Sequence, residues 1–188
     1  SNNTAVGKLA LASNTTGHSN TAVGYEAGKN NTSGGPFTFV GYQAGFNKGD
    51  NGSGEGTAVG YQALYASGGP LRNTAVGYQA LYATTNQGDS NTGVGYKALI
   101  ANTTGGNNTS MGDRSLTTNT TGAGNSGFGR YTLKLNTTGE ENTAVGYNAL
   151  ASNTTAHNNV AVGKNSLTSN TTGTTNTAVG TTALVHVT

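Results

Sequence analysis

The chain is a succession of short units in which apolar, small and polar positions return about every 17 residues. A Val-Gly pair marks most units, and the marker glycines follow one another at spacings of 17, 17, 19, 17, 18 and then 17 five times. These glycines are Gly7, Gly24, Gly41, Gly60, Gly77, Gly95, Gly112, Gly129, Gly146, Gly163 and Gly180. The consensus is N-T-A-V-G-Y-x-A-L-x-x-N-T-T-G-x-x, with short insertions near Lys48–Gly56 and Thr84–Asn91. Self-similarity at a fixed period predicts one continuous repeat domain over residues 1–188.

Two columns of mostly apolar residues are predicted to form the interior. The first directly precedes the glycine and contains Val6, Val23, Val40, Val59, Val76, Val94, Met111, Phe128, Val145, Val162 and Val179. The second lies four positions after it and contains Leu11, Gly28, Gly45, Leu64, Leu81, Leu99, Leu116, Leu133, Leu150, Leu167 and Leu184. The residue three after the glycine is always Ala, Ser or Thr, which predicts a crowded corner.

The local signals favour strands over helices. Gly and Asn occur in every unit and weaken helices. Thr-Ala-Val before the glycine is typical of a short strand, and a second short strand is expected over the Ala-Leu region. Asn and Gly tolerate the left-handed backbone conformations of turns, so Asn-Thr-Thr-Gly should close each coil. We therefore expect an all-β fold, a parallel β-solenoid or β-roll of about eleven 17-residue coils. Coils about 4.8 Å apart would make a rod about 50 Å long.

Self-association is expected because each coil has little apolar material. Burying one Val and one Leu yields about 3–6 kcal/mol, whereas ordering the backbone of one coil costs at least about 17 kcal/mol. Stacking of coils must close most of this gap, and burial between chains would add to it. Neither end of the repeat pattern resembles a cap, and open strand edges invite pairing. The chain is thus expected to be a segment of a longer shaft or a protomer of a homotrimer or an end-to-end filament.

Composition supports this view and narrows the function. Hydrophobic residues make up 32% of the chain and charged residues 9%, with a net charge of +2 and no cysteine. This excludes disulfides and cysteine-based chemistry. No apolar run is long enough for membrane insertion, and no signal peptide is evident. The charges are scattered along the sequence, so no nucleic-acid partner is expected.

The run Asn73-Thr74-Ala75-Val76-Gly77-Tyr78-Gln79-Ala80-Leu81 resembles the head repeats of trimeric autotransporter adhesins, with their Ser-Val-Ala-Ile-Gly-x-x-Ala motif. The units are also similar to shaft repeats of bacterial and phage tail-fibre-like proteins. The resemblance covers essentially the whole chain. It implies a parallel β-roll, often a homotrimer, in an extracellular stalk, adhesive head or phage particle. The adhesin repeat is shorter, since the extra residues here fall in the Asn-Thr-Thr-Gly loop, and no catalytic or binding residue carries over.

Two columns are candidates for recognition or modification. The tyrosines after the glycine could form an interface, a sugar-binding ladder or a cross-coil stack: Tyr25, Tyr42, Tyr61, Tyr78, Tyr96 and Tyr147. The Asn-Thr-Thr asparagines fit the N-x-[ST] acceptor pattern of glycosylation, and their alternative is an amide ladder between coils: Asn14, Asn102, Asn119, Asn136, Asn153 and Asn170.

The threonine two positions before the interior valine raises an ice-binding hypothesis. Strand alternation is expected to turn this threonine inward, which weakens the hypothesis. No catalytic, cofactor or metal site is predicted, and we do not expect an enzyme. The favoured interpretation is a structural extracellular fibre, shaft or adhesin segment. The alternative is a module that binds glycans, including those on cell surfaces.

Overall fold

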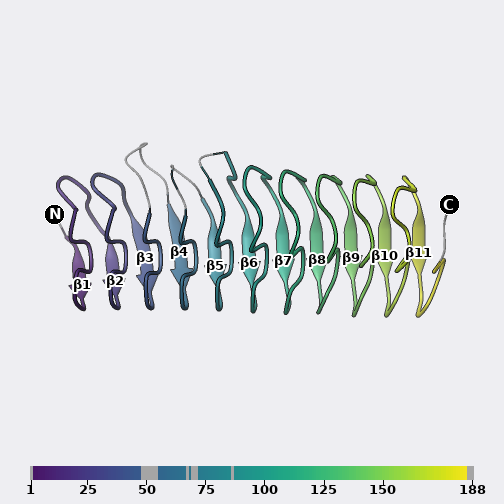
Figure 1. Cartoon of the computed structure of the whole chain (residues 1–188), viewed down its shortest axis with the longest axis horizontal. Coiled ribbons are helices and arrows are strands. Elements are labelled where there is room, and N and C mark those ends of the chain that lie inside the picture. The colour runs from purple at the N-terminus through teal and green to yellow at the C-terminus, as the bar shows by residue number, and fades with distance from the viewer. Residues whose placement is uncertain (1, 48–54, 67, 69–71, 86, 186–188) are drawn as a thin grey trace.

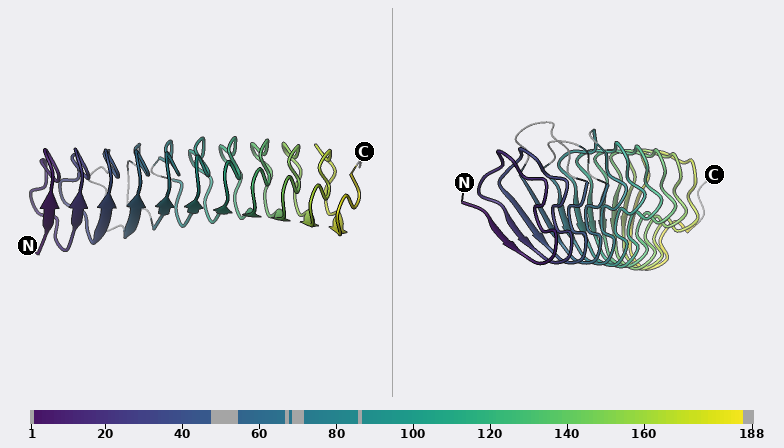
Figure 2. Two further views of the ribbon diagram at one scale, coloured as in Figure 1. Left: turned by 90° about the horizontal axis from the view of Figure 1, so that it is seen from below. Right: turned by 60° about the vertical axis from the view of Figure 1, so that its left-hand side comes forward.

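The computed structural model describes residues 2–47, 55–66, 68, 72–85 and 87–185, and shows one parallel sheet of eleven strands in sequence order. Successive coils stack along one long axis, with the two termini at opposite ends (Figure 1), and the strands line one side of the stack (Figure 2). The strands are β1 (Thr4–Val6), β2 (Thr21–Val23), β3 (Phe37–Val40), β4 (Gly56–Val59), β5 (Thr74–Val76), β6 (Thr92–Val94), β7 (Thr109–Met111), β8 (Ser126–Phe128), β9 (Thr143–Val145), β10 (Val160–Val162) and β11 (Thr177–Val179). The all-β solenoid prediction is confirmed.

The strands keep the register that the repeat predicts. Thr38 pairs with Thr57, and Thr74 pairs with Thr92, although each pair spans one of the longer spacings of the sequence. Most of the insertion near Lys48–Gly56 lies outside the described residues, and the strands on either side of both insertions stay paired. Each strand therefore meets the same residue types in its neighbours, and each column of the sequence becomes a row along the solenoid.

The predicted second strand is wrong, because the segment after the glycine is a chain of turns. In one coil Gln62 has a φ of 51° and Leu64 a φ of 54°, and other coils repeat this alternation. The coils remain bonded to one another here, since Leu64 N donates to Ala80 O at 3.0 Å. Left-handed conformations at alternate residues give this segment its own row of backbone hydrogen bonds outside the sheet.

The interior assignment was half right. The leucine column is buried, with Leu64, Leu81 and Leu116 at 0% exposure. The column before the glycine faces outward instead, with Val23 37% and Phe128 39% exposed. In a strand of three residues, alternation turns the two outer side chains to one face and only the central one to the other. The central residue is the inward one here.

The interior is narrow, so a large side chain in one column requires small residues beside it in the neighbouring column. Phe39 takes the central strand position that is small in other coils, and it is fully buried. Glycine replaces leucine on both sides of it: a Cβ on Gly28 would lie 2.7 Å from the Phe39 ring and a Cβ on Gly45 2.4 Å. The two gaps in the leucine column therefore provide the space for one phenylalanine.

The marker glycine allows neighbouring coils to approach closely. Gly77 has a φ of 133°, and a Cβ there would lie 2.4 Å from the carbonyl oxygen of Gly95. Both the backbone conformation and the contact exclude a side chain. The most regular feature of the sequence is thus a condition for coil stacking.

Candidate functional site

The Asn-Thr-Thr asparagines form a ladder inside the loop edge of the coils. Asn119 Nδ2 donates to Asn102 Oδ1 at 2.8 Å and to Gly122 O at 2.9 Å, and Asn136 makes the equivalent bonds one coil later. Five of the candidate glycosylation sites are fully buried with their amide nitrogens bonded: Asn102, Asn119, Asn136, Asn153 and Asn170. The sixth, Asn14, is partly buried and donates to Gly17 O at 3.2 Å. A glycan at any of the five buried positions would have to displace these amide bonds, so the geometry favours the amide ladder.

A second asparagine column directly precedes the strands. Asn125 Oδ1 accepts from the backbone N of Asn142 at 3.1 Å, and Asn125 Nδ2 donates to Gly139 O at 2.7 Å. Similar bonds run from coil to coil on either side. Buried polar groups are costly unless they are hydrogen-bonded, and here the amides before Asn176 bond to the next coil. The two asparagine columns thus add hydrogen bonds between coils to the contacts of the small apolar core.

The tyrosine column forms an exposed ladder of stacked rings at the opposite edge. The rings of Tyr25, Tyr42, Tyr61, Tyr78 and Tyr96 follow one another with centroid separations of 5.0–5.2 Å and interplanar angles of 6–15°. Tyr147 lies apart from this ladder, tilted by 58° against Tyr131. The structure brings together five of the six tyrosines that the sequence singled out. Each inner ring has its faces turned to the rings before and after it, so the ladder presents ring edges and hydroxyl groups to solvent.

The next residue column adds a polar ladder beside the tyrosines. Gln79 Nε2 donates to Gln62 Oε1 at 3.0 Å, Gln62 to Gln43 at 2.9 Å, and Gln43 to Glu26 Oε2 at 2.7 Å. The row ends on a carboxylate that also binds Lys29. The pKa of Glu26 is lowered, first by the hydrogen bond from Lys29 and then by that from Gln43.

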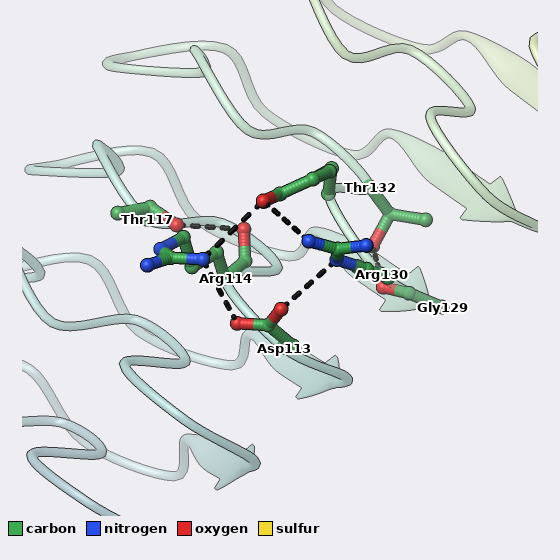
Figure 3. Close-up of polar contacts among 7 residues, drawn as sticks. Asp113, Arg114, Thr117, Gly129, Arg130 and Thr132 are labelled. Carbon is green, nitrogen blue, oxygen red and sulfur yellow. Dashed lines mark hydrogen bonds and ion pairs between the residues drawn. The ribbon is translucent and has the colours of Figure 1, made fainter.

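The corner changes character after β7 and β8, where charged side chains replace the tyrosines (Figure 3). Asp113 Oδ2 accepts from Arg130 Nε at 3.0 Å, and its Oδ1 lies 3.5 Å from Arg114 Nη1. Tyr131 Oη accepts from Arg130 Nη2 at 2.8 Å and from Arg114 Nη1 at 3.3 Å. The pKa of Arg130 is raised, first by its bond to Tyr131. One carboxylate and one phenol oxygen therefore hold two guanidinium groups.

No family model, curated protein or solved structure matches this chain.

The charged corner corrects the expectation of scattered charge. Arg114, Arg130 and Lys134 lie in two successive units of the sequence, yet all surround the ring of Tyr131, at 5.9, 4.4 and 5.0 Å from its centroid. The repeat period provides the signal that could have found this cluster, since residues one period apart are neighbours. Within the described ranges, no cavity and no group of three or more His, Asp or Glu side chains able to hold a metal is present.

The strand threonines also lie differently from the prediction. They are exposed or half-buried on the outer face of the sheet, beside the outward valines. In the described coils their hydroxyl groups have no protein partner, whereas loop threonines such as Thr103, Thr120 and Thr137 donate to carbonyls of the next coil at 3.0–3.1 Å. The outer face of the sheet therefore carries a row of unbonded hydroxyls beside a row of methyl groups. Its strands contain no charged residue. The described residues include no helix that is long and apolar enough to cross a membrane.

Proposed function

We propose that the protein is a structural rod, a segment of an extracellular fibre, shaft or adhesin that lengthens by adding coils. The observation that carries this proposal is the unbroken register of eleven parallel strands, with the same backbone contacts repeated at each step. The free energy of folding of such a stack is roughly a sum of contributions from neighbouring coils. A longer rod therefore needs only more copies of the same coil. The resemblance to adhesin and tail-fibre repeats supports a location outside the cell or on a phage particle.

The two outer edges of the sheet are complementary. Thr4 N donates to Asn20 O, so the alternation of a parallel ladder turns the N–H and C=O of Ala5 away from β2. At the other end, Val160 N donates to Asn176 O and Gly180 N to Val162 O, which leaves the N–H and C=O groups of Thr177 and Val179 on the outer side. Ala5 of one copy can therefore continue the ladder of Val179 in another, in the register that the chain already uses.

Electron microscopy of the purified 188-residue chain tests this proposal. Rods of one chain length, about 50 Å, should join end to end as concentration rises. Ala5→Pro removes one outer N–H and should shorten or abolish the filaments while circular dichroism stays unchanged. A compact globule, or filaments unaffected by this variant, would refute end-to-end growth. A homotrimer would instead give a fixed mass of three chains by sedimentation, whatever the edge variant.

A second function is favoured by the outer sheet face. Six successive strands, β1–β6, present Thr and Val in the same outward positions, with hydroxyls that no described protein group bonds. A rigid, uncharged array of hydroxyls and methyls is suited to ordering water, so we propose ice binding as the second candidate. Variants in the Thr/Val face and in a loop distinguish ice binding by this face from a general effect of the rod surface on ice growth.

Thermal hysteresis at micromolar protein provides the test of ice binding. Thr74→Lys within the array should lower the hysteresis, whereas Thr120→Val in the loop should leave it unchanged. Absence of ice shaping by both the single chain and its filaments would eliminate this candidate. The rod proposal would stand, because it rests on the register of the strands and not on their outer face.

A further inference from the structure

We propose that the corner after β6, β7 and β8 binds an acidic polysaccharide through the carboxylate or sulfate groups of its sugars. This basic corner contains four cations, one anion and two tyrosines: Lys97, Arg114, Arg130, Lys134, Asp113, Tyr96 and Tyr131. The proposal goes beyond a structural rod, because it gives one short stretch of the solenoid a ligand of its own.

Charge is concentrated at this corner. Its four cations and one anion leave a local excess of three positive charges, more than the +2 of the whole chain. The corners after β3, β4 and β5 are uncharged at the same two positions, which hold tyrosine and glutamine. An anion that approaches the rod therefore meets its strongest attraction here.

Hydrogen-bond donors outnumber acceptors within the basic corner. Each guanidinium has five N–H groups, and Asp113 and Tyr131 supply the acceptors that the two arginines share. In the described part of the chain, Arg114 Nη2 and Arg130 Nη1 donate to no protein acceptor. The side chains of these arginines are 37% and 52% exposed. The unused donors are thus accessible to a carboxylate or sulfate, which guanidinium groups bind through paired hydrogen bonds.

The cations are already held in place. Arg114 lies 4.9 Å from the centroid of the Tyr96 ring, and Arg130 lies 4.4 Å from that of Tyr131. Lys97 and Lys134 lie over the same two rings at 5.3 and 5.0 Å. Long side chains normally lose rotamer freedom on binding, and stacking on rings that are fixed by the solenoid reduces that loss.

The arrangement of the rings indicates which polyanion fits. Single-stranded nucleic acids bind by stacking bases on open aromatic faces. The faces of Tyr96 and Tyr131 are occupied by neighbouring rings and cations. Neutral sugars that stack on aromatic faces meet the same obstacle. What remains exposed is positive charge and N–H donors, which matches an acidic polysaccharide.

Binding of defined polymers to the full chain tests the proposal. Dextran sulfate, polygalacturonate, neutral dextran and single-stranded poly(dT) are compared by biolayer interferometry at several salt concentrations. We expect binding of one or both acidic polysaccharides, weakening as salt rises, and none of neutral dextran. The first two polymers distinguish sulfate from carboxylate as the recognised group. Equal or stronger binding of poly(dT), or binding of no acidic polymer, would overturn the proposal.

Variants locate the site. Arg130→Gln and Lys134→Gln should each weaken binding about tenfold, whereas Lys8→Gln and Lys164→Gln, which remove the same charge at other corners, should change it by less than about twofold. Asp113→Asn removes the carboxylate that competes with the polysaccharide for Arg114 and Arg130, so it should tighten binding. A variant that failed to fold would instead bind more weakly. Equal effects of all four cation variants would show a response to net charge alone and overturn the assigned site. If Asp113→Asn weakened binding while circular dichroism stayed native, the assigned geometry would be wrong. Sedimentation of each variant detects any change in self-association.

Discussion

Along the loop edge of the solenoid, asparagine side chains are buried and bonded at their amides, whereas along the corner edge the tyrosine rings are 39–42% exposed. Each edge carries a ladder of like side chains over several successive coils. The corner column nevertheless holds Tyr, Lys, Asp, Arg or Thr in different coils, while the position before the strand is Asn in most of them. The difference follows from burial, since an exposed ring can be exchanged for a charged group without leaving a polar atom unpaired.

This comparison indicates how the molecule separates stability from recognition. Backbone contacts, marker glycines and asparagines fix the stack, and the outward corner is free to change. Substitutions in each feature separate these contributions to stability.

The closest contact between coils should be the most sensitive. Gly77→Ala combines a backbone conformation suited to glycine with a Cβ 2.4 Å from Gly95 O, and should lower the free energy of unfolding by about 4 kcal/mol. Urea denaturation followed by circular dichroism measures this free energy. Gly180→Ala is the matched control, because its φ is 129° but the nearest atom to a Cβ is 3.8 Å away. Equal losses in both variants would assign the effect to backbone conformation alone.

The buried asparagine column should come next. Asn125→Ala leaves the buried backbone N–H of Asn142 without its acceptor and removes one of the two amide donors to the carbonyl of Gly139. It should cost about 3 kcal/mol by the same measurement. Asn47→Ala disrupts an exposed rung of the same chemistry, in which Asn30 Nδ2 donates to Asn47 Oδ1. That control should change stability by less than about 0.5 kcal/mol. Similar costs at both sites would contradict the proposed dependence on burial.

The tyrosine ladder should contribute less. Tyr61→Ala removes a ring between Tyr42 and Tyr78, at 5.1 and 5.0 Å, and should lower stability by about 1.5 kcal/mol. Tyr61→Phe keeps the stack and should be nearly neutral. A loss for Tyr61→Phe as large as for Tyr61→Ala would show that the hydroxyl matters more than stacking.

One defect in the asparagine ladder can be repaired. Thr84 is fully buried, its hydroxyl has no partner among the described residues, and it precedes Asn102 in the ladder. Thr84→Asn supplies an oxygen for Asn102 Nδ2 and should raise stability by about 1 kcal/mol, seen as a higher melting temperature. Thr85→Asn, at an exposed position, should bring no gain. A lower melting temperature for Thr84→Asn would mean that the site lacks room for the larger side chain.

The smallest effect concerns an exposed ion pair at the loop edge. The pKa of Asp89 is lowered to about 2, chiefly by the hydrogen bond from Arg72. A carboxylate with a lowered folded-state pKa adds stability above its ordinary value of 3.8, and loses that contribution as pH falls toward 2. Asp89→Asn should therefore cost about 0.5 kcal/mol at pH 7 and nothing near pH 2. Urea unfolding at both pH values measures this, and a cost that persists at pH 2 would rule out ionisation as its cause.

The sequence was sufficient to predict the coil period, the parallel stack and the buried leucines, because identical spacing forces identical neighbours. It failed on which strand residues face inward. Hydropathy favours Val23 for the interior, but a three-residue strand admits one inward side chain, and the narrow interior accepts only Ala22. The glycines at Gly28 and Gly45 likewise became intelligible only once Phe39 was seen between them.

The candidate sites were predictable where they consist of residues at the same position of successive repeats, because such residues lie side by side along the solenoid. The spacing of the repeats predicted the tyrosine ladder. It also predicted an asparagine ladder as the alternative to glycosylation. The burial of Asn102 and Asn119 depends on which way the loop turns, and apolar periodicity does not specify that. The basic corner does not stand out along the sequence, because its charged residues come from successive units and become neighbours only across coils.

The central claim is that repeated backbone pairing between coils, with buried asparagine ladders, gives this chain its shape. X-ray diffraction from an aligned, hydrated sample of the protein tests it most directly. The structure predicts a reflection along the rod axis at about 4.8 Å, from coils stacked one strand apart. A helical repeat of about 5.4 Å, or a pattern without a preferred axis, would contradict it.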